Sequence, residues 1–346
     1  MDYVDLLPLS LLFLLLIEID SIRESNAINK DYLSIKNGNV LRGLFAIVVV
    51  FHHLAQRMES GTIFQCFKHV GYLAVSVFFF LSGYGLQKAF ITSENYKKHF
   101  LSKRLSKIII PYMIVVVIYW ICYSIMGDAL SLRSILESMM KGSPFVSNSW
   151  YIICICNFYI AFWIFMTMTK NQFDLMVFLA IIWYGFYVFY CRLLGYGAWW
   201  YNSTHLLVGG MYWAIHERDI IFFVKKYYTN VFSLVFIGFL FTYISGFMVD
   251  TWLSMILKML SSVLFVVTVI LISLKIKVKD GIFGILGSIS MELYLIHGLV
   301  ISVLRSDIIF IRNDFLWSCV VSVGSILSGW FLHQFFSKIS RVLDSR

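Results

Sequence analysis

Long apolar segments separated by short polar breaks constrain this chain more than any other feature. Eleven such segments can be placed, each bounded by charged or turn-forming residues. Most approach the ~20 residues that a helix needs to cross a ~30 Å hydrocarbon core, although the first and seventh are short. Backbone groups in hydrocarbon must be satisfied within the segment, which favours helices. The segments are 3–19, 40–57, 70–90, 108–126, 150–168, 174–192, 204–216, 231–249, 252–273, 282–304 and 315–336.

Composition supports a membrane protein and excludes an ordinary soluble domain. Of the 346 residues, 60% are hydrophobic and only 14% are charged, and the mean hydropathy is +0.81. These values lie far from those of soluble globular proteins. We therefore predict an all-α polytopic integral membrane protein with about ten to eleven transmembrane helices and no soluble domain.

The basic residues indicate how the chain is oriented. The net charge of +9 could suggest a nucleic-acid partner, but Lys and Arg sit in the breaks between apolar segments, where they act as topology signals. A nucleic-acid partner is therefore excluded. With eleven spans, one set of loops holds seven basic residues, namely Arg57, Lys68, Arg133, Lys141, Arg192, Arg305 and Arg312. The other set, with the C-terminus, holds twenty, namely Arg23, Lys30, Lys36, Arg42, Lys88, Lys97, Lys98, Lys103, Arg104, Lys107, Lys170, Arg218, Lys225, Lys226, Lys275, Lys277, Lys279, Lys338, Arg341 and Arg346.

Twenty against seven predicts that the second set is cytoplasmic, so the N-terminus lies outside and the C-terminus inside a plasma membrane. No linker, low-complexity tract or repeat divides the chain. We predict an extra membrane helix with a cytoplasmic loop over residues 1–37, one membrane domain over 38–337 and a short tail over 338–346. The six cysteines form no CxxC pair and are typical of small apolar fillers, so no metal site is expected.

One apolar segment carries titratable groups at both ends, in the stretch LRGLFAIVVVFHHL (41–54). On a helix, His53 lies about 20° around the axis and ~16 Å along it from Arg42, whereas His52 points about 80° away. Such groups are costly in hydrocarbon and mark functional sites. The alternative interpretation is a snorkelling arginine with a histidine at the far interface.

Two further stretches lie toward the cytoplasmic side. GYLAVSVFFFLSGYGL holds Ser82 and Gly83, where small residues allow close approach of a helix or a ligand. FLSKRLSKIIIPY gathers Lys103, Arg104 and Lys107 at the start of the fourth span. This basic cluster is an ordinary positive-inside anchor in one interpretation and suits a phosphate-rich ligand in the other.

The tenth segment contains LGSISMELYLIHGLV, in which Ser290, Tyr294 and His297 share one helical stripe. His297 falls in the outer half of the membrane, near the level of His53, and His205 supplies a third ring at that height. Glu292 faces elsewhere and is expected to pair with Lys258 or a loop cation. The alternative is that His297 and Tyr294 form a polar bridge between helices.

Taken in order, these motifs resemble the acyltransferase-3 family of membrane O-acyltransferases. The resemblance rests on LRGLFAIVVVFHHL, VSVFFFLSGYGL, the basic run ending in IPY, NSWYI (148–152) and SISMELYLIH, and it covers residues 38 to 300. The family's spacing between arginine and histidine selects His53, in agreement with the helical face.

The resemblance implies transfer of an acyl group, commonly acetyl, from cytoplasmic acyl-CoA to a hydroxyl of a sugar, glycolipid or cell-envelope polysaccharide. No permanently bound cofactor is expected, since acyl-CoA is a co-substrate. The bilayer and a hydroxylated glycan or lipid-linked acceptor are expected partners, and a second copy of the chain is a further candidate. The acceptor, the acyl length and the route, direct or through an acyl-histidine, stay open.

Roles can be assigned to individual residues on this basis. We expect His53 to act as general base, with His297 and Tyr294 beside it. The acyl-CoA site is expected to comprise Arg42, Ser82, Gly83, Lys103, Arg104 and Lys107. The acceptor side is expected to include His52, Trp150 and His205. A transporter of a polar or anionic molecule is the main alternative; it predicts inverted repeats and broken helices, and the sequence indicates neither.

Overall fold

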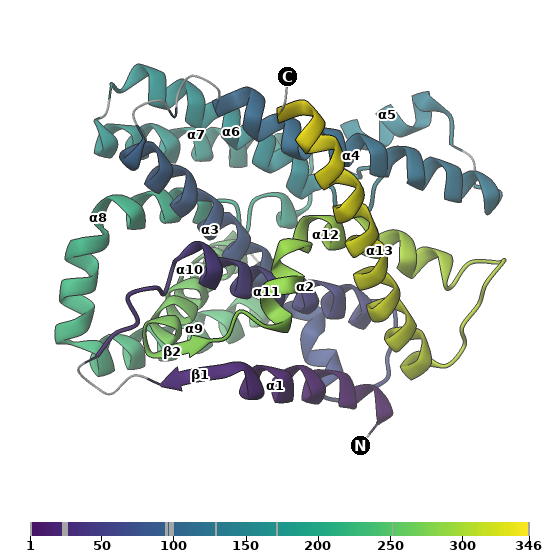
Figure 1. The fold of residues 1–346 in the computed structure, drawn as a ribbon, viewed down its shortest axis with the longest axis horizontal. Coiled ribbons are helices and arrows are strands. Elements are labelled where there is room, and N and C mark those ends of the chain that lie inside the picture. The colour runs from purple at the N-terminus through teal and green to yellow at the C-terminus, as the bar shows by residue number, and fades with distance from the viewer. Residues whose placement is uncertain are drawn as a thin grey trace.

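A computed structural model describes residues 2–22, 27–93, 96, 100–128, 130–170, 172–250 and 252–344. Four residues used in the charge count, Arg23, Lys97, Lys98 and Arg346, lie outside these ranges. The described chain is a bundle of helices with one small two-stranded sheet, in which α2 and α12 lie near the middle (Figure 1).

The elements follow one another with short connections. They are η1 (Tyr3–Asp5), α1 (Leu6–Glu18), β1 (Ile19–Ile22), α2 (Ile35–Ala55), η2 (Phe64–His69), α3 (Gly71–Thr92), α4 (Phe100–Ile125), α5 (Leu132–Met140), α6 (Trp150–Met168), α7 (Phe173–Leu193), η3 (Ala198–Trp200), α8 (Leu206–Lys226), α9 (Tyr228–Met248), α10 (Trp252–Lys275), β2 (Ile276–Val278), α11 (Ile282–Ser288), α12 (Ser290–Val303) and α13 (Asp314–Asp344).

Eight helices within the described ranges are long and apolar enough to cross a membrane, and the bent pair α11 and α12 would make a ninth span. The eight are α2, α3, α4, α6, α7, α9, α10 and α13. Large apolar side chains stand exposed on α7 and α9, such as Phe186 at 69% and Leu234 at 76%, as expected of surfaces that face lipid. The predicted all-α polytopic membrane fold is confirmed.

Each of the eleven predicted apolar segments contains a helix, but two helices fall short of a span. Helix α1 has only 13 residues, which rise about 20 Å. Helix α8 has 21 residues but includes the charged run His216 to Asp219. By length and composition, the described helices therefore form fewer membrane spans than the eleven predicted from the sequence.

The prediction of one helix over residues 282–304 is wrong, because the segment bends by 81° between α11 and α12. Helix α11 packs flush against α2: a Cβ on Gly287 would overlap the carbonyl of Asn39, and one on Gly43 would overlap the carbonyl of Phe283. Beyond this contact the chain turns, and α12 crosses the bundle interior with nine of its 14 residues buried. The broken helix is thus a feature that the sequence analysis did not anticipate.

The N-terminal segment is tied to the bundle at both of its ends. The buried Asp5 carboxylate accepts hydrogen bonds from the backbone N–H groups of Thr62, Ile63 and Phe64 at 3.2, 2.9 and 2.9 Å. At the other end, the Glu18 carboxylate accepts from the first backbone N–H groups of α11. Strand β1 then pairs with β2 in antiparallel fashion. The predicted domain boundary at residue 37 stays a prediction.

Helices α3 and α8 approach each other closely through paired glycines. A Cβ on Gly83 would overlap the carbonyl of Leu207, and one on Gly210 would overlap the carbonyl of Phe80. Small residues let the two helix backbones meet without intervening side chains. Of the two possibilities that the sequence left open for Gly83, the structure places it against a helix.

We predict that Gly83→Ala destabilises the protein by about 1–3 kcal/mol, because the methyl group forces two helix backbones apart. Gly85→Ala is the matched control on the same helix, since no atom lies within 4 Å of a Cβ there. Thermal unfolding of the purified protein in detergent measures both. Equal midpoints for the two variants would contradict the proposed helix contact.

Candidate active site

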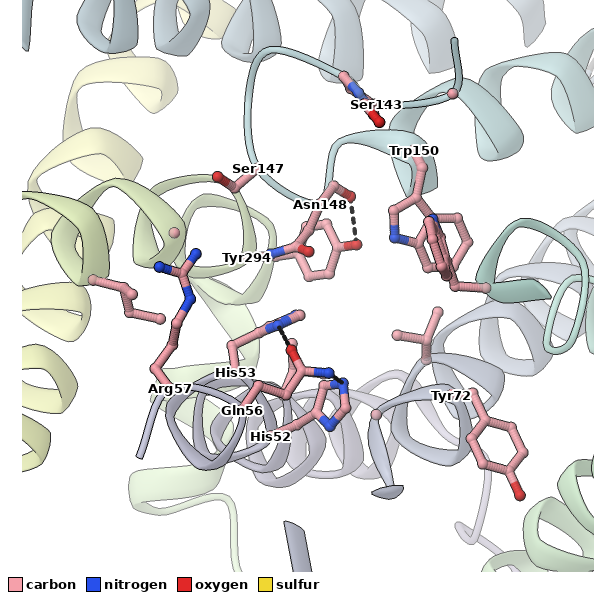
Figure 2. Close-up of a pocket in the computed structure, with 18 residues that line it drawn as sticks. His52, His53, Gln56, Arg57, Tyr72, Ser143, Ser147, Asn148, Trp150 and Tyr294 are labelled. Carbon is pink, nitrogen blue, oxygen red and sulfur yellow. Dashed lines mark hydrogen bonds between the residues drawn. The ribbon is translucent and has the colours of Figure 1, made fainter. Parts of the chain in front are cut away.

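A cavity of about 450 Å³ opens where α2, α3, α12 and the loop before α6 meet. Figure 2 shows His52, His53 and Gln56 rising from α2 on one side, with Asn148, Tyr294 and Trp150 opposite. Among the described residues, no acidic side chain lines it. The lining residues are Val49, His52, His53, Gln56, Arg57, Gly71, Tyr72, Val75, Gly142, Ser143, Pro144, Ser147, Asn148, Trp150, Trp199, Tyr294, Gly298 and Ile301.

The two adjacent histidines are joined by one glutamine. His53 Nδ1 lies 3.1 Å from Gln56 Oε1, and the Gln56 amide nitrogen lies 3.2 Å from His52 Nε2. On its other side, His52 Nδ1 lies 2.9 Å from the carbonyl oxygen of Phe67 in η2. The helical end of α2 thus presents both rings to the cavity within a connected hydrogen-bond chain.

The opposite wall holds His297 against His53. The two rings stack with their centroids 5.2 Å apart and 29° between their planes. His297 is fully buried, with Nδ1 3.1 Å from the Leu293 carbonyl and Nε2 3.4 Å from the Asn148 amide nitrogen. Both ring nitrogens of His297 are therefore engaged, and its ring face supports His53.

Asn148 connects this wall to the loop before α6. Its backbone has a positive φ of 66°, a conformation that asparagine adopts more readily than most residues. Its carbonyl oxygen accepts a hydrogen bond of 2.7 Å from the Tyr294 hydroxyl. The asparagine thereby joins His297 and Tyr294 in one network.

A second cavity, of about 250 Å³, lies at the other end of the Arg42 to His53 helix face. Three basic residues, Arg42, Arg104 and Lys107, line it together with Ser82. Arg104 donates to the Tyr96 hydroxyl at 3.1 Å. Burial raises the pKa of Tyr96, so this partner is a neutral hydroxyl and does not offset the positive charge of Arg104.

The second cavity contains other features suited to an anion. Ser290 and Met291, the first residues of α12, line it, and the N-terminus of a helix carries a partial positive charge. Within the part of the chain that the structure describes, its lining includes no acidic residue. The remaining residues are Phe78, Ile108, Tyr151, Ile152, Ile155, Tyr159 and Tyr294. The cavity is thus basic, with apolar and aromatic walls.

Tyr294 lines both cavities. Its ring packs against Tyr151 with centroids 5.3 Å apart, and Tyr151 lines the second cavity. The basic cavity and the histidine cavity therefore lie back to back, with this tyrosine between them.

Of the predicted site residues, the structure brings together His52, His53, Trp150 and Tyr294 in the first cavity and Arg42, Ser82, Arg104, Lys107 and Tyr294 in the second, with His297 behind His53. Three others lie elsewhere. Lys103 is exposed, Gly83 packs against α8, and His205 Nε2 lies 3.2 Å from both the Met259 carbonyl and the Ser262 hydroxyl on α10.

The expected pairing of Glu292 with Lys258 or a loop cation is wrong. The buried Glu292 carboxylate lies 3.0 Å from His333 Nδ1, because α13 packs along α12. The Lys258 ammonium instead lies 4.6 Å from the centroid of the Phe247 ring.

Sequence reasoning missed Gln56, Arg57 and Asn148 as lining residues. A signal existed for two of them. Gln56 lies three and four residues after the two histidines, a spacing that places side chains together on a helix. Asn148 opens the NSWYI stretch, of which only Trp150 was selected. Within the described residues, no group of three or more His, Cys, Asp or Glu side chains could hold a metal ion.

Comparison with protein families identifies one match. The model of an acyltransferase domain, that of the acyltransferase-3 family, matches residues 36–334, which is most of the 346-residue chain. Comparisons with curated proteins and with solved structures gave no significant match. The matched range holds both cavities and the helices that form them, and the chain belongs to the acyltransferase-3 family of membrane acyltransferases.

Proposed function

We propose that this acyltransferase moves an acyl group, acetyl in the first instance, from cytoplasmic acyl-CoA to a hydroxyl of a sugar, glycolipid or cell-envelope polysaccharide. The observation that carries the proposal is the pair of cavities that share Tyr294. One cavity is basic and the other contains a histidine suited to proton transfer. A two-substrate reaction with a large anionic donor requires both.

The basic cavity suits the donor. Arg42, Arg104 and Lys107 can meet phosphate groups by charge-assisted hydrogen bonds. The aromatic and apolar walls around Tyr151 suit a pantetheine arm, which is largely uncharged. Along α2, His53 lies ~16 Å beyond Arg42, a distance comparable to the length of that arm.

The histidine cavity suits the acceptor. Trp150, Trp199 and Tyr72 offer aromatic faces on which sugar rings can stack, and Ser147 and Asn148 offer polar groups. Trp199 is 53% exposed, so it lies where an acceptor would enter.

The chemistry is then an acyl transfer with His53 as general base. The acceptor hydroxyl oxygen attacks the thioester carbon while a ring nitrogen of His53 takes the hydroxyl proton. The carbon–sulfur bond breaks, the ester forms, and the CoA thiolate leaves and is protonated. A route through an acyl-histidine uses the same residue as nucleophile.

His297 and Tyr294 take supporting roles in this scheme. The stacked His297 ring fixes the position of His53. The Tyr294 hydroxyl donates its single proton to the Asn148 carbonyl, so its hydroxyl is free to accept rather than to donate. We propose that Tyr294 shapes the passage between donor and acceptor.

The direct test is release of free CoA. Purified protein is incubated with acetyl-CoA and a hydroxylated envelope glycan, and thiol release and glycan acetylation are measured together. Both should depend on the protein and on the acceptor. No thiol release, together with uptake of a polar or anionic small molecule by vesicles that contain the protein, would instead favour the transporter alternative.

We predict that His53→Ala abolishes acyl transfer while His52→Ala keeps substantial activity. In the proposed scheme His53 is the base, and His52 contacts it through Gln56. Initial rates on protein matched for expression and thermal stability give the comparison. An active His53→Ala together with an inactive His52→Ala would reverse the assignment.

We predict that Arg42→Ala weakens acyl-CoA binding by about tenfold or more and slows turnover at saturation much less, since it removes a contact made equally in ground and transition states. Lys103→Ala should have a smaller effect, because Lys103 lies outside the cavity lining. Titration with acyl-CoA measures both, and Lys225→Ala, exposed on α8, controls for net charge. Unchanged affinity with reduced turnover would exclude Arg42 from phosphate binding.

The fourth prediction concerns sidedness in a plasma membrane with the N-terminus outside. Donor and acceptor should enter from opposite faces, because CoA is too polar to cross and only its arm would penetrate. In inside-out vesicles, acetyl-CoA added outside should acetylate a glycan trapped in the lumen. A requirement for both substrates on one side would contradict the through-membrane route but not the enzyme class.

A further inference from the structure

We propose that Gln56 and His52 are positioning residues that hold His53 in a single tautomer, with the proton on Nδ1 and the lone pair on Nε2. The inference rests on the proposed role of His53 as general base and extends it to two residues that need not touch either substrate. It follows from the order of donors and acceptors in the chain from Phe67 to His53 (Figure 2).

The chain begins at a group that can only accept. The Phe67 carbonyl oxygen lies 2.9 Å from His52 Nδ1, so His52 must carry a proton on Nδ1 to make this bond. A neutral imidazole has one N–H donor, and its other nitrogen is an acceptor. His52 Nε2 therefore presents a lone pair to Gln56.

That lone pair orients the glutamine amide. Of the two ends of the Gln56 side chain, only the NH₂ group can donate, so it must face His52 Nε2, at 3.2 Å. The amide oxygen then necessarily faces the other histidine, 3.1 Å from His53 Nδ1. The glutamine thus transmits the constraint without an ionisable group.

The glutamine oxygen can only accept, so His53 must carry its proton on Nδ1. The lone pair of the neutral ring then lies on Nε2, which has no hydrogen-bond partner among the described residues. His53 lines the cavity, so Nε2 is the nitrogen left to take a proton. An imidazole with its proton on the wrong nitrogen cannot act as a base there.

The packing around the His52 ring supports this arrangement. The ring packs on the first residue of α3, where a Cβ on Gly71 would overlap the ring atoms. The ring is therefore confined between the α3 terminus and the Phe67 carbonyl. This explains why two histidines stand side by side: one acts on the substrate, and the other fixes the hydrogen-bond direction that reaches it.

Nitrogen NMR of the full-length protein, labelled on its histidine rings, tests the tautomer without any assay of activity. The His53 signals are identified by their loss in His53→Gln. We expect a protonated Nδ1 and an unprotonated Nε2 in the neutral ring of His53. A proton on Nε2, or an even mixture, would overturn the inference even if the acyltransferase reaction is confirmed. The expected tautomer in a protein that transfers no acyl group would instead overturn the proposed function alone.

Kinetics of four variants then test whether the chain matters for turnover. Gln56→Met keeps the side-chain length but removes both hydrogen bonds, and kcat should fall by about tenfold or more with KM for acyl-CoA little changed. Gln56→Glu should retain most activity, because both carboxylate oxygens accept. His52→Ala should fall between these two, since the amide loses its orientation but can still accept from His53.

The double variant His52→Ala with Gln56→Glu gives the most decisive comparison. Both oxygens of a carboxylate accept hydrogen bonds, so the carboxylate at position 56 can accept from His53 in either orientation and does not need His52 to orient it. Turnover of the double variant should therefore recover above that of His52→Ala alone. A double variant no better than His52→Ala would show that His52 acts by packing and would overturn the positioning role.

Discussion

The cost of placing polar groups inside a bilayer governs how this molecule is built. Arg42 and His53 occupy one face of α2, a helix that otherwise consists mostly of buried apolar residues. Neither can be left to hydrocarbon, since unpaired polar groups there cost several kcal/mol. Each therefore lies at a cavity and has a local partner, Asn39 for Arg42 at 3.2 Å and Gln56 for His53. The surrounding helices supply the walls of those cavities, and the site is a consequence of this requirement.

Glycine contacts and one bend bring the walls into place. Close backbone contact between α2 and α11 fixes the start of the bent pair, and the 81° turn carries α12 across the bundle. The turn places the first residues of α12 at the basic cavity and Tyr294 between the cavities. A straight helix could not both pack along α2 near Gly43 and present its N-terminus beside Arg104.

Much of this could be predicted from the sequence, and the failures have a common origin. Hydrophobic segments and helical spacing located every membrane-spanning helix, although not the short α5, and put Arg42 and His53 on one face, because both properties are local. The bend at Ile289, the close contact at Gly83 and the pairing of Glu292 with His333 depend on which helices become neighbours, and periodicity does not encode that. Asn148 is a similar case, because its left-handed backbone and its contact with His297 depend on how the loop before α6 packs against α12. Lys103 shows the opposite limit: it is next to Arg104 in the sequence, but it does not line the basic cavity.

The shared tyrosine has a consequence for passage between the two cavities. Tyr294 lines both cavities and the Tyr151 ring packs against it, so these two tyrosines form the partition between the cavities. A partition made of aromatic side chains is thin, so any substrate group that passes between the two cavities must displace these rings. The bond from Tyr294 to the Asn148 carbonyl holds the ring in this partition, so one side chain sets both the separation of the two cavities and the access between them.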